Sequence, residues 1–476
     1  MSDYEATRQR HVARAMTLAP HLFDQLDWPA ERLAKRRTRM LRDLVRTATE
    51  RSPWYRNRLS GVDVNHLDET TLPRLPVLTK PELMEHFDDI LTDRRLSLAG
   101  IDQHLATVET GSYLVGRYTA LTSGGSSGQR GVFVYDWDAW AAFWLTCCRT
   151  VLRARNSYPD LTARPAVMAS VTAAHFSHAT AAMARTFSSP RMATVRFPVT
   201  LRTEEIVAGL NDVQPDFMLV YASVLYALAH EAAAGRLRIA PRRVLTGAEP
   251  LLPEIRAAAE QAWGVKVINI WGTSEGGGTG VGCDRGSTHL SEDQLIVEPV
   301  DLAGRPLPPG ERSAKVYLTN LYNPVLPLIR YEITDEVTVL PEPCPCGSAH
   351  RRIADIQGRL DDVFTYPGRQ QVHPHLFRSA LSREAGVVEY QVRQTQAGAA
   401  IAVRCAAPVS LDGLRDRIAA ALALAGLDRP QVTVEKVDRL ERSSGPAKLK
   451  RFIPLAADCE SASPAPRPRA AVGAGR

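Results

Sequence analysis

The sequence has no apolar run that approaches the roughly 20 residues of a membrane-spanning helix. Its opening stretch, MSDYEATRQRH, also lacks the apolar core of a secretory signal peptide. These absences argue against a membrane or secreted protein, so we expect a cytoplasmic one with no membrane partner. A chain of 476 residues with 45% hydrophobic and 23% charged residues is typical of a soluble globular protein of two or three domains.

Cysteine is also scarce, and seven cysteines, an odd number, do not describe a disulfide framework. Their clustering is more informative than their count. Cys344 and Cys346 are one residue apart, and Cys283 and His289 share another loop. Two thiolates with a cysteine and a histidine from a second loop make a tetrahedral set suited to zinc. His350 is the rival for the fourth ligand, and spacing alone does not decide between the two histidines.

The chain has little excess charge for a nucleic-acid-binding protein. Its net charge is +6, from 58 basic and 52 acidic residues that are mostly interspersed. The densest basic run, residues 32–42 (RLAKRRTRMLR), follows a helical pattern, and we interpret it as a solvated helix face. We therefore expect no nucleic-acid partner.

The pattern of the chain changes along its length. Residues 1–110 look helical, with SPWYRNRL (52–59) ending a helix and LPRLPVLTKPEL (72–83) serving as a proline-punctuated connector. From residue 118 strands alternate with helices, which favours a largely parallel sheet with ligand sites at the carboxyl ends of its strands. After residue 285 the strands look shorter and more antiparallel, and GRLDDVF near residue 358 resembles a domain boundary.

These patterns predict an α/β fold. A large N-terminal region of parallel-rich α/β sheets, with a small β-barrel-like part, precedes a small, mobile α+β C-terminal domain. The expected division is a helical segment at 1–110, the α/β part with a zinc-bound loop at 111–358, the small domain at 359–457 and a disordered tail at 458–476.

Residues 121–131, LTSGGSSGQRG, combine glycines and hydroxyls in the way that a phosphate-holding loop needs. The stretch lacks the lysine of a Walker A loop, and it lies between predicted strands instead of opening a helix as a dinucleotide loop does. Taken alone, such a stretch is more often a linker or a hairpin than a phosphate loop.

Five further segments change this interpretation: TGAEPL (246–251), INIWGTSEGG (268–277), LIRYEITDEV (328–337), IQGRLDDVF (356–364) and SSGPAKLKRF (443–452). In this order, and after the glycine-rich loop, they resemble the motifs of adenylate-forming ligases, and more narrowly those of the phenylacetate–CoA ligase branch. The resemblance extends over residues 35–457.

The resemblance implies a two-step reaction. ATP and a carboxylic acid, aryl or small acyl, give acyl-AMP and pyrophosphate, and a thiol then takes the acyl group. CoA is the expected acceptor and partner, while a carrier-protein thiol, an amine or a hydroxyl stays open. The chain would be a monomer or a homodimer.

The resemblance also implies roles for residues around the nucleotide. Glu275 would bind Mg²⁺, Thr273 would act near the α-phosphate with Ser274, and Trp271 would lie near the adenine. Asp335 would accept the ribose hydroxyls, and Arg359 would contact the nucleotide ahead of a hinge at Asp361. The loop residues assigned to the β- and γ-phosphates are Thr122, Ser123, Gly124, Ser126, Ser127 and Gly128, and other nucleotide contacts fall to Gly247, Ala248, Glu249 and Gly272.

Lys448 matches the lysine of the small domain that reaches the carboxylate and the α-phosphate as charge builds on them. Lys450 competes for this role, because Pro446 and Ala447 separate Lys448 from the usual glycine. Gly125 and the pair at 129–130 (QR) also depart from the family's phosphate-loop pattern. For the Cys/His set, some members of the branch carry a structural zinc in a similar arrangement.

The acid pocket is expected around two segments, TAAHFSHAT (172–180) and VYASVLYAL (220–228), with His175 and His178 more often packing than chemistry. A rival from another class is a basic, zinc-containing binding protein that has lost catalysis. Against it, Glu275, Asp335 and Lys448 all keep the residue types that catalysis needs.

Overall fold

The computed structural model describes most of the chain. The described residues are 3–106, 113–123, 131–174, 176–199, 201, 203–354, 356, 364–367, 371–372, 375–381, 384, 386–405, 407–441 and 451–455. Among their helices, none combines the length and the apolar character needed to cross a membrane.

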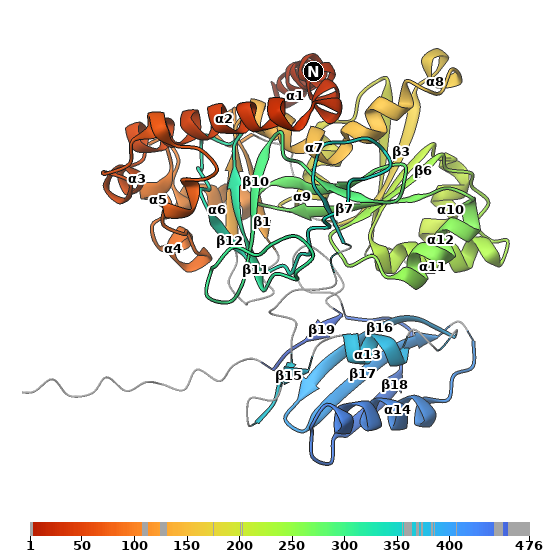
Figure 1. Cartoon of the computed structure of the whole chain (residues 1–476). Coiled ribbons are helices and arrows are strands. Elements are labelled where there is room, and N and C mark those ends of the chain that lie inside the picture. The colour runs from red at the N-terminus through yellow and green to blue at the C-terminus, as the bar shows by residue number, and fades with distance from the viewer. Residues whose placement is uncertain are drawn as a thin grey trace, which may run out of the picture.

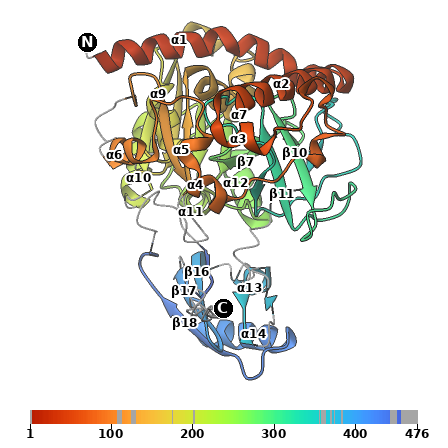
Figure 2. The ribbon, with the colours of Figure 1, turned by 90° about the vertical axis from the view of Figure 1, so that its left-hand side faces the viewer.

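Helices make up the N-terminal segment. Figures 1 and 2 show α1 and α2 lying across the end of the large part that is remote from the C-terminal domain. At residues 52–59, where a helix end was expected, α2 does end at Arg51, but a new short helix also begins: Ser52 caps it by accepting a hydrogen bond from the Tyr55 amide, with Pro53 at its first position. The helices are α1 (Asp3–Asp24), α2 (Ala30–Arg51), α3 (Pro53–Arg58), α4 (Lys80–Glu85), α5 (Phe87–Ile90) and α6 (Leu98–Ala106).

An eight-stranded sheet forms the centre of the large part, in the order β13-β9-β8-β7-β6-β5-β3-β4. The run from β4 through β3, β5 and β6 to β7 is parallel, and β8, β9 and β13 continue it in antiparallel pairing. The strands are β3 (Ala166–Thr172), β4 (Met192–Pro198), β5 (Phe217–Val220), β6 (Arg243–Gly247), β7 (Val267–Thr273), β8 (Gly277–Gly282), β9 (Thr288–Leu290) and β13 (Arg352–Ile353). The predicted parallel-rich α/β fold is confirmed.

The two faces of this sheet pack in separate cores because side chains alternate along each strand. Met168 and Leu245 share a core with α7 and the N-terminal helices. Ala169, Met218 and Val244 point the other way, into a core with α10, α11 and α12. The helices are α7 (Trp137–Arg155), α8 (Asp160–Ala163), α9 (Ala179–Thr186), α10 (Thr203–Val213), α11 (Ala222–Ala233) and α12 (Pro253–Trp263).

Two smaller sheets flank this core. β1 (Thr119–Ser123) and β2 (Gly131–Tyr135) form an antiparallel hairpin whose connection is the glycine-rich loop. β10 (Leu295–Val300), β11 (Lys315–Asn320) and β12 (Tyr331–Ile333) form an antiparallel sheet of three strands. Where a barrel-like part was expected, the described strands therefore form an open sheet.

The C-terminal domain has its own sheet, ordered β18-β17-β16-β19, and its own core around Phe377, Ile401 and Leu414. Figure 1 shows it below the large part, where α11 meets β16. Its elements are β14 (Phe364–Thr365), β15 (Gln371–Val372), α13 (His375–Leu381), β16 (Val387–Thr395), β17 (Gly398–Cys405), α14 (Leu411–Leu424), β18 (Gln431–Lys436) and β19 (Phe452–Ile453). The boundaries expected at 110 and 358, and the tail at 458–476, fall outside the described residues.

Candidate functional site

The carboxyl ends of β6 and β7 lie side by side, and each leads into one of the predicted motifs. Gly247 ends β6, where a Cβ atom would lie 2.8 Å from the carbonyl oxygen of Ile270 on β7. Glycine is therefore needed for the two strands to approach this closely. Ala248 follows with a φ of +66°, so the chain turns sharply away from the sheet.

Trp271 and Asp335 come from motifs that are far apart in the sequence and meet in the structure. The indole Nε1 of Trp271 donates a hydrogen bond of 2.6 Å to Oδ2 of Asp335. Both side chains are buried, with 5% and 3% of their surfaces exposed. The indole ring and the carboxylate are thus held in a fixed relationship at the end of β7.

The turn after β7 is held by a hydrogen bond of its own and by contacts from two other segments. The Thr273 hydroxyl accepts a hydrogen bond from the Gly276 amide at 3.0 Å. Tyr135 of β2 donates to the carbonyl oxygen of Ser274 at 2.5 Å, and Asn320 of β11 donates to that of Glu275 at 2.8 Å. Glu275 itself is buried. The sequence analysis missed Tyr135 and Asn320, and no motif marks either of them.

Three polar atoms near the ends of β5 and β6 have no hydrogen-bond partner among the described residues, although they are buried. They are the Ser223 hydroxyl, the Thr246 hydroxyl and Oε1 of Glu249. The other carboxylate oxygen of Glu249 accepts a hydrogen bond of 2.8 Å from the Ser223 amide. Buried polar groups are normally satisfied, so these atoms suit a bound polar ligand or water.

The glycine-rich loop is anchored at its start. The Thr122 amide donates to the carbonyl oxygen of Ser177 at 2.8 Å, so the hairpin lies against the segment that follows β3. The Ser123 hydroxyl accepts a hydrogen bond from the Gly131 amide at 3.1 Å. Several predicted site residues lie outside the described residues: Gly124, Ser126, Ser127, Gly128, His175, Arg359, Lys448 and its rival Lys450.

The predicted Cys/His set converges in space. The ligand atoms of Cys283, His289, Cys344 and Cys346 all lie within 4.8 Å of one another. The sulfur atoms of Cys283 and Cys344 are 3.9 Å apart, and Nε2 of His289 is 3.3 Å from the sulfur of Cys346. Tetrahedral zinc with Zn–S bonds of about 2.3 Å separates neighbouring sulfurs by about 3.8 Å, so the donor set fits this ion.

Hydrogen bonds around the cluster show which of the two candidate histidines can be its fourth ligand. Nδ1 of His289 donates a hydrogen bond of 2.9 Å to the backbone carbonyl oxygen of His350, which leaves Nε2 directed at the thiols. The ring of His350 is buried, with its nitrogens 3.1 Å from the carbonyl oxygen of Leu290 and 3.2 Å from that of Gln25. His350 therefore orients the metal-site histidine through its backbone and does not join the cluster.

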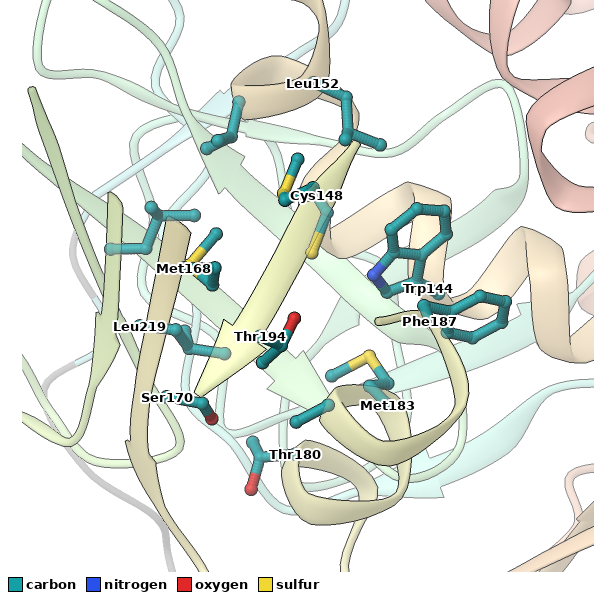
Figure 3. Close-up of a pocket in the computed structure, with 14 residues that line it drawn as sticks. Trp144, Cys148, Leu152, Met168, Ser170, Thr180, Met183, Phe187, Thr194 and Leu219 are labelled. Carbon is teal, nitrogen blue, oxygen red and sulfur yellow. The ribbon is translucent and has the colours of Figure 1, made fainter. Parts of the chain in front are cut away.

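A pocket lies between the sheet and the helices α7 and α9 (Figure 3). It contains about 530 Å³ of empty space, including the part that is open to solvent. The rings of Trp144 and Phe187 stack at 4.4 Å and form one wall. Thr180 lines the pocket, and its hydroxyl lies 3.1 Å from that of Tyr221 and 2.9 Å from Nδ1 of His178. The other lining residues are Cys148, Val151, Leu152, Met168, Ser170, Met183, Ala184, Met192, Thr194, Leu219 and Leu245.

No family model matches the chain. Curated proteins that are similar to it share one name. The phenylacetate–coenzyme A ligase of Thermus thermophilus is 29% identical over 381 residues, which are 76% of this chain and 78% of the relative. The enzyme of the same name from Pseudomonas putida is 34% identical over 179 residues, 35% of this chain and 39% of the relative.

Solved structures share the fold. A 2-hydroxyisobutyryl-CoA ligase in its postadenylation state aligns with a TM-score of 0.68 at 19% identity, over 90% of this chain and 91% of the other. An anthranilate CoA ligase aligns with a TM-score of 0.50 at 15% identity, over 70% and 65% of the two chains. Together with the ordered motifs and the converging Trp271 and Asp335, these similarities support the adenylate-forming ligase superfamily for this chain, and within it the phenylacetate–CoA ligase-like branch.

Proposed function

We propose that the protein is an AMP-forming acid–CoA ligase. It would activate a carboxylic acid with ATP as the acyl adenylate, release pyrophosphate and transfer the acyl group to the thiol of CoA. The observation that carries this proposal is the hydrogen bond between Trp271 and Asp335, because it joins the two motifs that would hold the adenine and the ribose.

Each side chain around this bond would have a defined task. Asp335 would accept hydrogen bonds from the ribose hydroxyls, for which a carboxylate is well suited. The unpartnered polar atoms of Ser223, Thr246 and Glu249 would face the nucleotide or its surrounding water. Glu275 would hold Mg²⁺, which prefers oxygen ligands and would neutralise charge on the phosphates.

The pocket between the sheet and α9 would take the acyl part of the acid. Its lining is mostly apolar, and the stacked rings of Trp144 and Phe187 provide a flat wall. Thr180, Tyr221 and His178 form a hydrogen-bonded group at its polar side. The apolar and aromatic character of this lining suits an aryl or small apolar acid, and the relatives carry the name of one aryl acid, phenylacetate.

The arrangement of the domains is consistent with the first half-reaction. The chain aligns with the 2-hydroxyisobutyryl-CoA ligase at a TM-score of 0.68 in the postadenylation state and of 0.57 in the thioesterification state. We propose on this basis that the described arrangement corresponds to the first conformation. Lys448 would reach the reacting carboxylate from the small domain, and a carrier-protein thiol is the second candidate for the acceptor.

Zinc at Cys283, His289, Cys344 and Cys346 would be structural. Four protein ligands fill a tetrahedral site and leave no open position for a substrate. Bound there, the ion would tie the loop after β8 to the segment before β13. No step of the reaction needs to pass through it.

The test is acid-dependent exchange of pyrophosphate with ATP, measured over a panel of aryl and small acyl acids, followed by thioester formation with CoA or a carrier protein. Exchange with at least one aryl or small acyl acid and formation of its CoA thioester support the proposal. If no acid supports exchange and the protein binds nucleic acid in a salt-dependent way, the non-catalytic binding protein is the better interpretation.

Lys448 is tested by separating the half-reactions. Lys448→Ala should abolish exchange, while transfer from preformed acyl-AMP to CoA should survive. Lys450→Ala is the matched control and should keep both reactions. Loss of both half-reactions in Lys448→Ala, or the reverse pattern between the two variants, would contradict the assignment.

A further inference from the structure

Arg451 belongs to the motif at 443–452 and is attached to β16 of the C-terminal domain. Its carbonyl oxygen accepts a hydrogen bond of 2.7 Å from the Val392 amide. Its guanidinium carbon lies 4.8 Å from the centroid of the Tyr390 ring, and Tyr390 is buried. A backbone hydrogen bond and an aromatic contact therefore hold the arginine on this strand.

Strand β16 is where the C-terminal domain meets α11 of the large part (Figure 1). Tyr226 lies on that helix. Burial and the charge of Glu254 raise the pKa of Tyr226, and the positive charge of Arg451 opposes this rise. Arg451 is therefore near enough to the large part for its charge to act on a side chain of α11.

Glu249 lies at the start of the same helix. One of its carboxylate oxygens accepts the 2.8 Å hydrogen bond from the amide of Ser223, which is the second residue of α11. Its other oxygen and Nε of Arg451 are both buried without a hydrogen-bond partner among the described residues. Burial alone would lower the pKa of Arg451, but neighbouring charges outweigh it and raise this pKa. After Tyr390, the largest of these contributions comes from Glu249, ahead of Glu389 in the arginine's own domain.

A buried guanidinium group stays charged, so it requires a compensating anion nearby. Interfaces between the domains of one chain are modest in area and largely polar, and charge pairs within such an interface fix its register. Turning the C-terminal domain away would remove a compensating charge from both Arg451 and Glu249, which is costly in partly buried surroundings. The pair therefore favours the described contact between β16 and α11.

We propose that Arg451 is a positioning residue for acyl-AMP formation, which holds the C-terminal domain against α11 through its charge beside Glu249. The inference rests on the proposed function, in which Lys448 acts from this domain. Lys448 precedes Arg451 by three residues, a stretch of chain that spans at most about 11 Å, so holding Arg451 restricts the reach of the lysine. A carboxylate accepts several hydrogen bonds, so Glu249 can serve Arg451 and still face the nucleotide or water.

The first experiment measures the two half-reactions separately. Arg451→Ala should lower the rate of pyrophosphate exchange about tenfold, because a small displacement of the lysine is enough to slow the reaction. Arg451→Lys should recover part of this rate, and transfer from preformed acyl-AMP to CoA should change less than about twofold in both variants. An equal loss of the two half-reactions would show a merely structural role and overturn the proposal.

Arg393→Ala is the matched control. Arg393 lies on the same strand and pairs with Glu441, whose side chain is 83% exposed, so both half-reactions should be kept. Glu249→Gln tests the partner. In the Glu249→Gln background, Arg451→Ala should have little further effect on exchange, because the contact is already lost. Losses that multiply would mean that Arg451 acts independently of Glu249, which would contradict the proposal.

Hydroxyl-radical footprinting of Tyr226 tests the domain contact without turnover. Oxidation of this ring should rise at least about twofold in Arg451→Ala, because the C-terminal domain would open from α11 more often, and it should not change in Arg393→Ala. Unchanged oxidation in Arg451→Ala would overturn the proposal. If oxidation rises but no acid supports exchange, the contact between the domains stands and the proposed function is refuted. Thermal unfolding of Arg451→Lys checks that its fold is retained.

Discussion

The indole nitrogen of Trp271 donates a 2.6 Å hydrogen bond to the carboxylate of Asp335, across 64 residues of sequence. Both groups are buried, so the bond holds the ring and the carboxylate in place without help from a ligand. A nucleotide would then bind to an indole ring and a carboxylate that are already oriented. Fewer side chains need to be ordered on binding, so the entropic cost of binding is smaller.

Replacing Trp271 by phenylalanine should raise the KM for ATP about tenfold. The substitution keeps an aromatic ring and removes the donor to Asp335, and a hydrogen bond to a charged group contributes about 1.5–3 kcal/mol. The change should be seen in pyrophosphate exchange at saturating acid, with little effect on the KM for the acid.

Trp28→Phe is the matched control, because Nε1 of Trp28 donates a comparable hydrogen bond of 2.7 Å to Asp24 in the N-terminal helices. It should leave the KM for ATP unchanged. An equal effect of both substitutions would show that Trp271 acts through general stability and not through the nucleotide site.

Filling the pocket between the sheet and α9 should change which acids are used. Ala184 lines this pocket, so Ala184→Phe should raise the KM for aromatic acids at least about tenfold and affect acetate or propionate much less. Ala233→Phe, at an exposed position at the end of α11, is the control. If Ala184→Phe weakens all acids equally, the pocket is not the acyl site.

The alternation of strands and helices predicted the parallel sheet, and the motifs predicted which segments would lead out of the carboxyl ends of its strands, because both patterns are local. The bond between Trp271 and Asp335 was beyond such reasoning, since it depends on packing between β7 and the segment after β12.

The two candidate histidines of the metal site show another limit of prediction from the sequence. Spacing in the sequence left His289 and His350 equivalent, and only the antiparallel pairing of β13 with β9, which sets Arg352 opposite His289, separates them. By contrast, the start of α3 had a readable signal. Ser52 followed by Pro53 is a typical helix start, and the expectation of a helix end at this segment left that start out.

Removing one cysteine of the cluster should remove zinc and destabilise the large part of the chain. Elemental analysis should find close to one zinc per chain in the unmodified protein and less than half in Cys344→Ser. Because binding of a structural metal contributes to folding free energy, the Tm should fall by at least about 5 °C. Cys405→Ser, at a thiol of β17 outside the cluster, should keep both the zinc and the Tm. Substoichiometric zinc in the unmodified protein would refute the site.

Arg149 and Asp293 form a buried ion pair that joins α7 to the segment between β9 and β10. Its two hydrogen bonds measure 2.5 and 2.8 Å, and at most 3% of either side chain is exposed. Burial alone would raise the pKa of Asp293, but the charge and the hydrogen bonds of Arg149 outweigh it and hold this pKa well below its ordinary value of 3.8.

Asp293→Asn should therefore reduce the free energy of unfolding by about 3–5 kcal/mol at pH 7, because it leaves the charge of Arg149 buried and uncompensated. A carboxylate with a depressed pKa in the folded state stabilises the protein above its unfolded pKa and loses this contribution as the pH falls below it. The difference between the two proteins, measured by urea unfolding, should be constant from pH 7 to 5 and shrink below pH 3.8. Asp284→Asn removes the partner of Arg243 from a pair whose carboxylate side chain is 70% exposed, and should change stability by less than about 1 kcal/mol. A pH-independent difference for Asp293→Asn would mean that shape, and not charge, explains its effect.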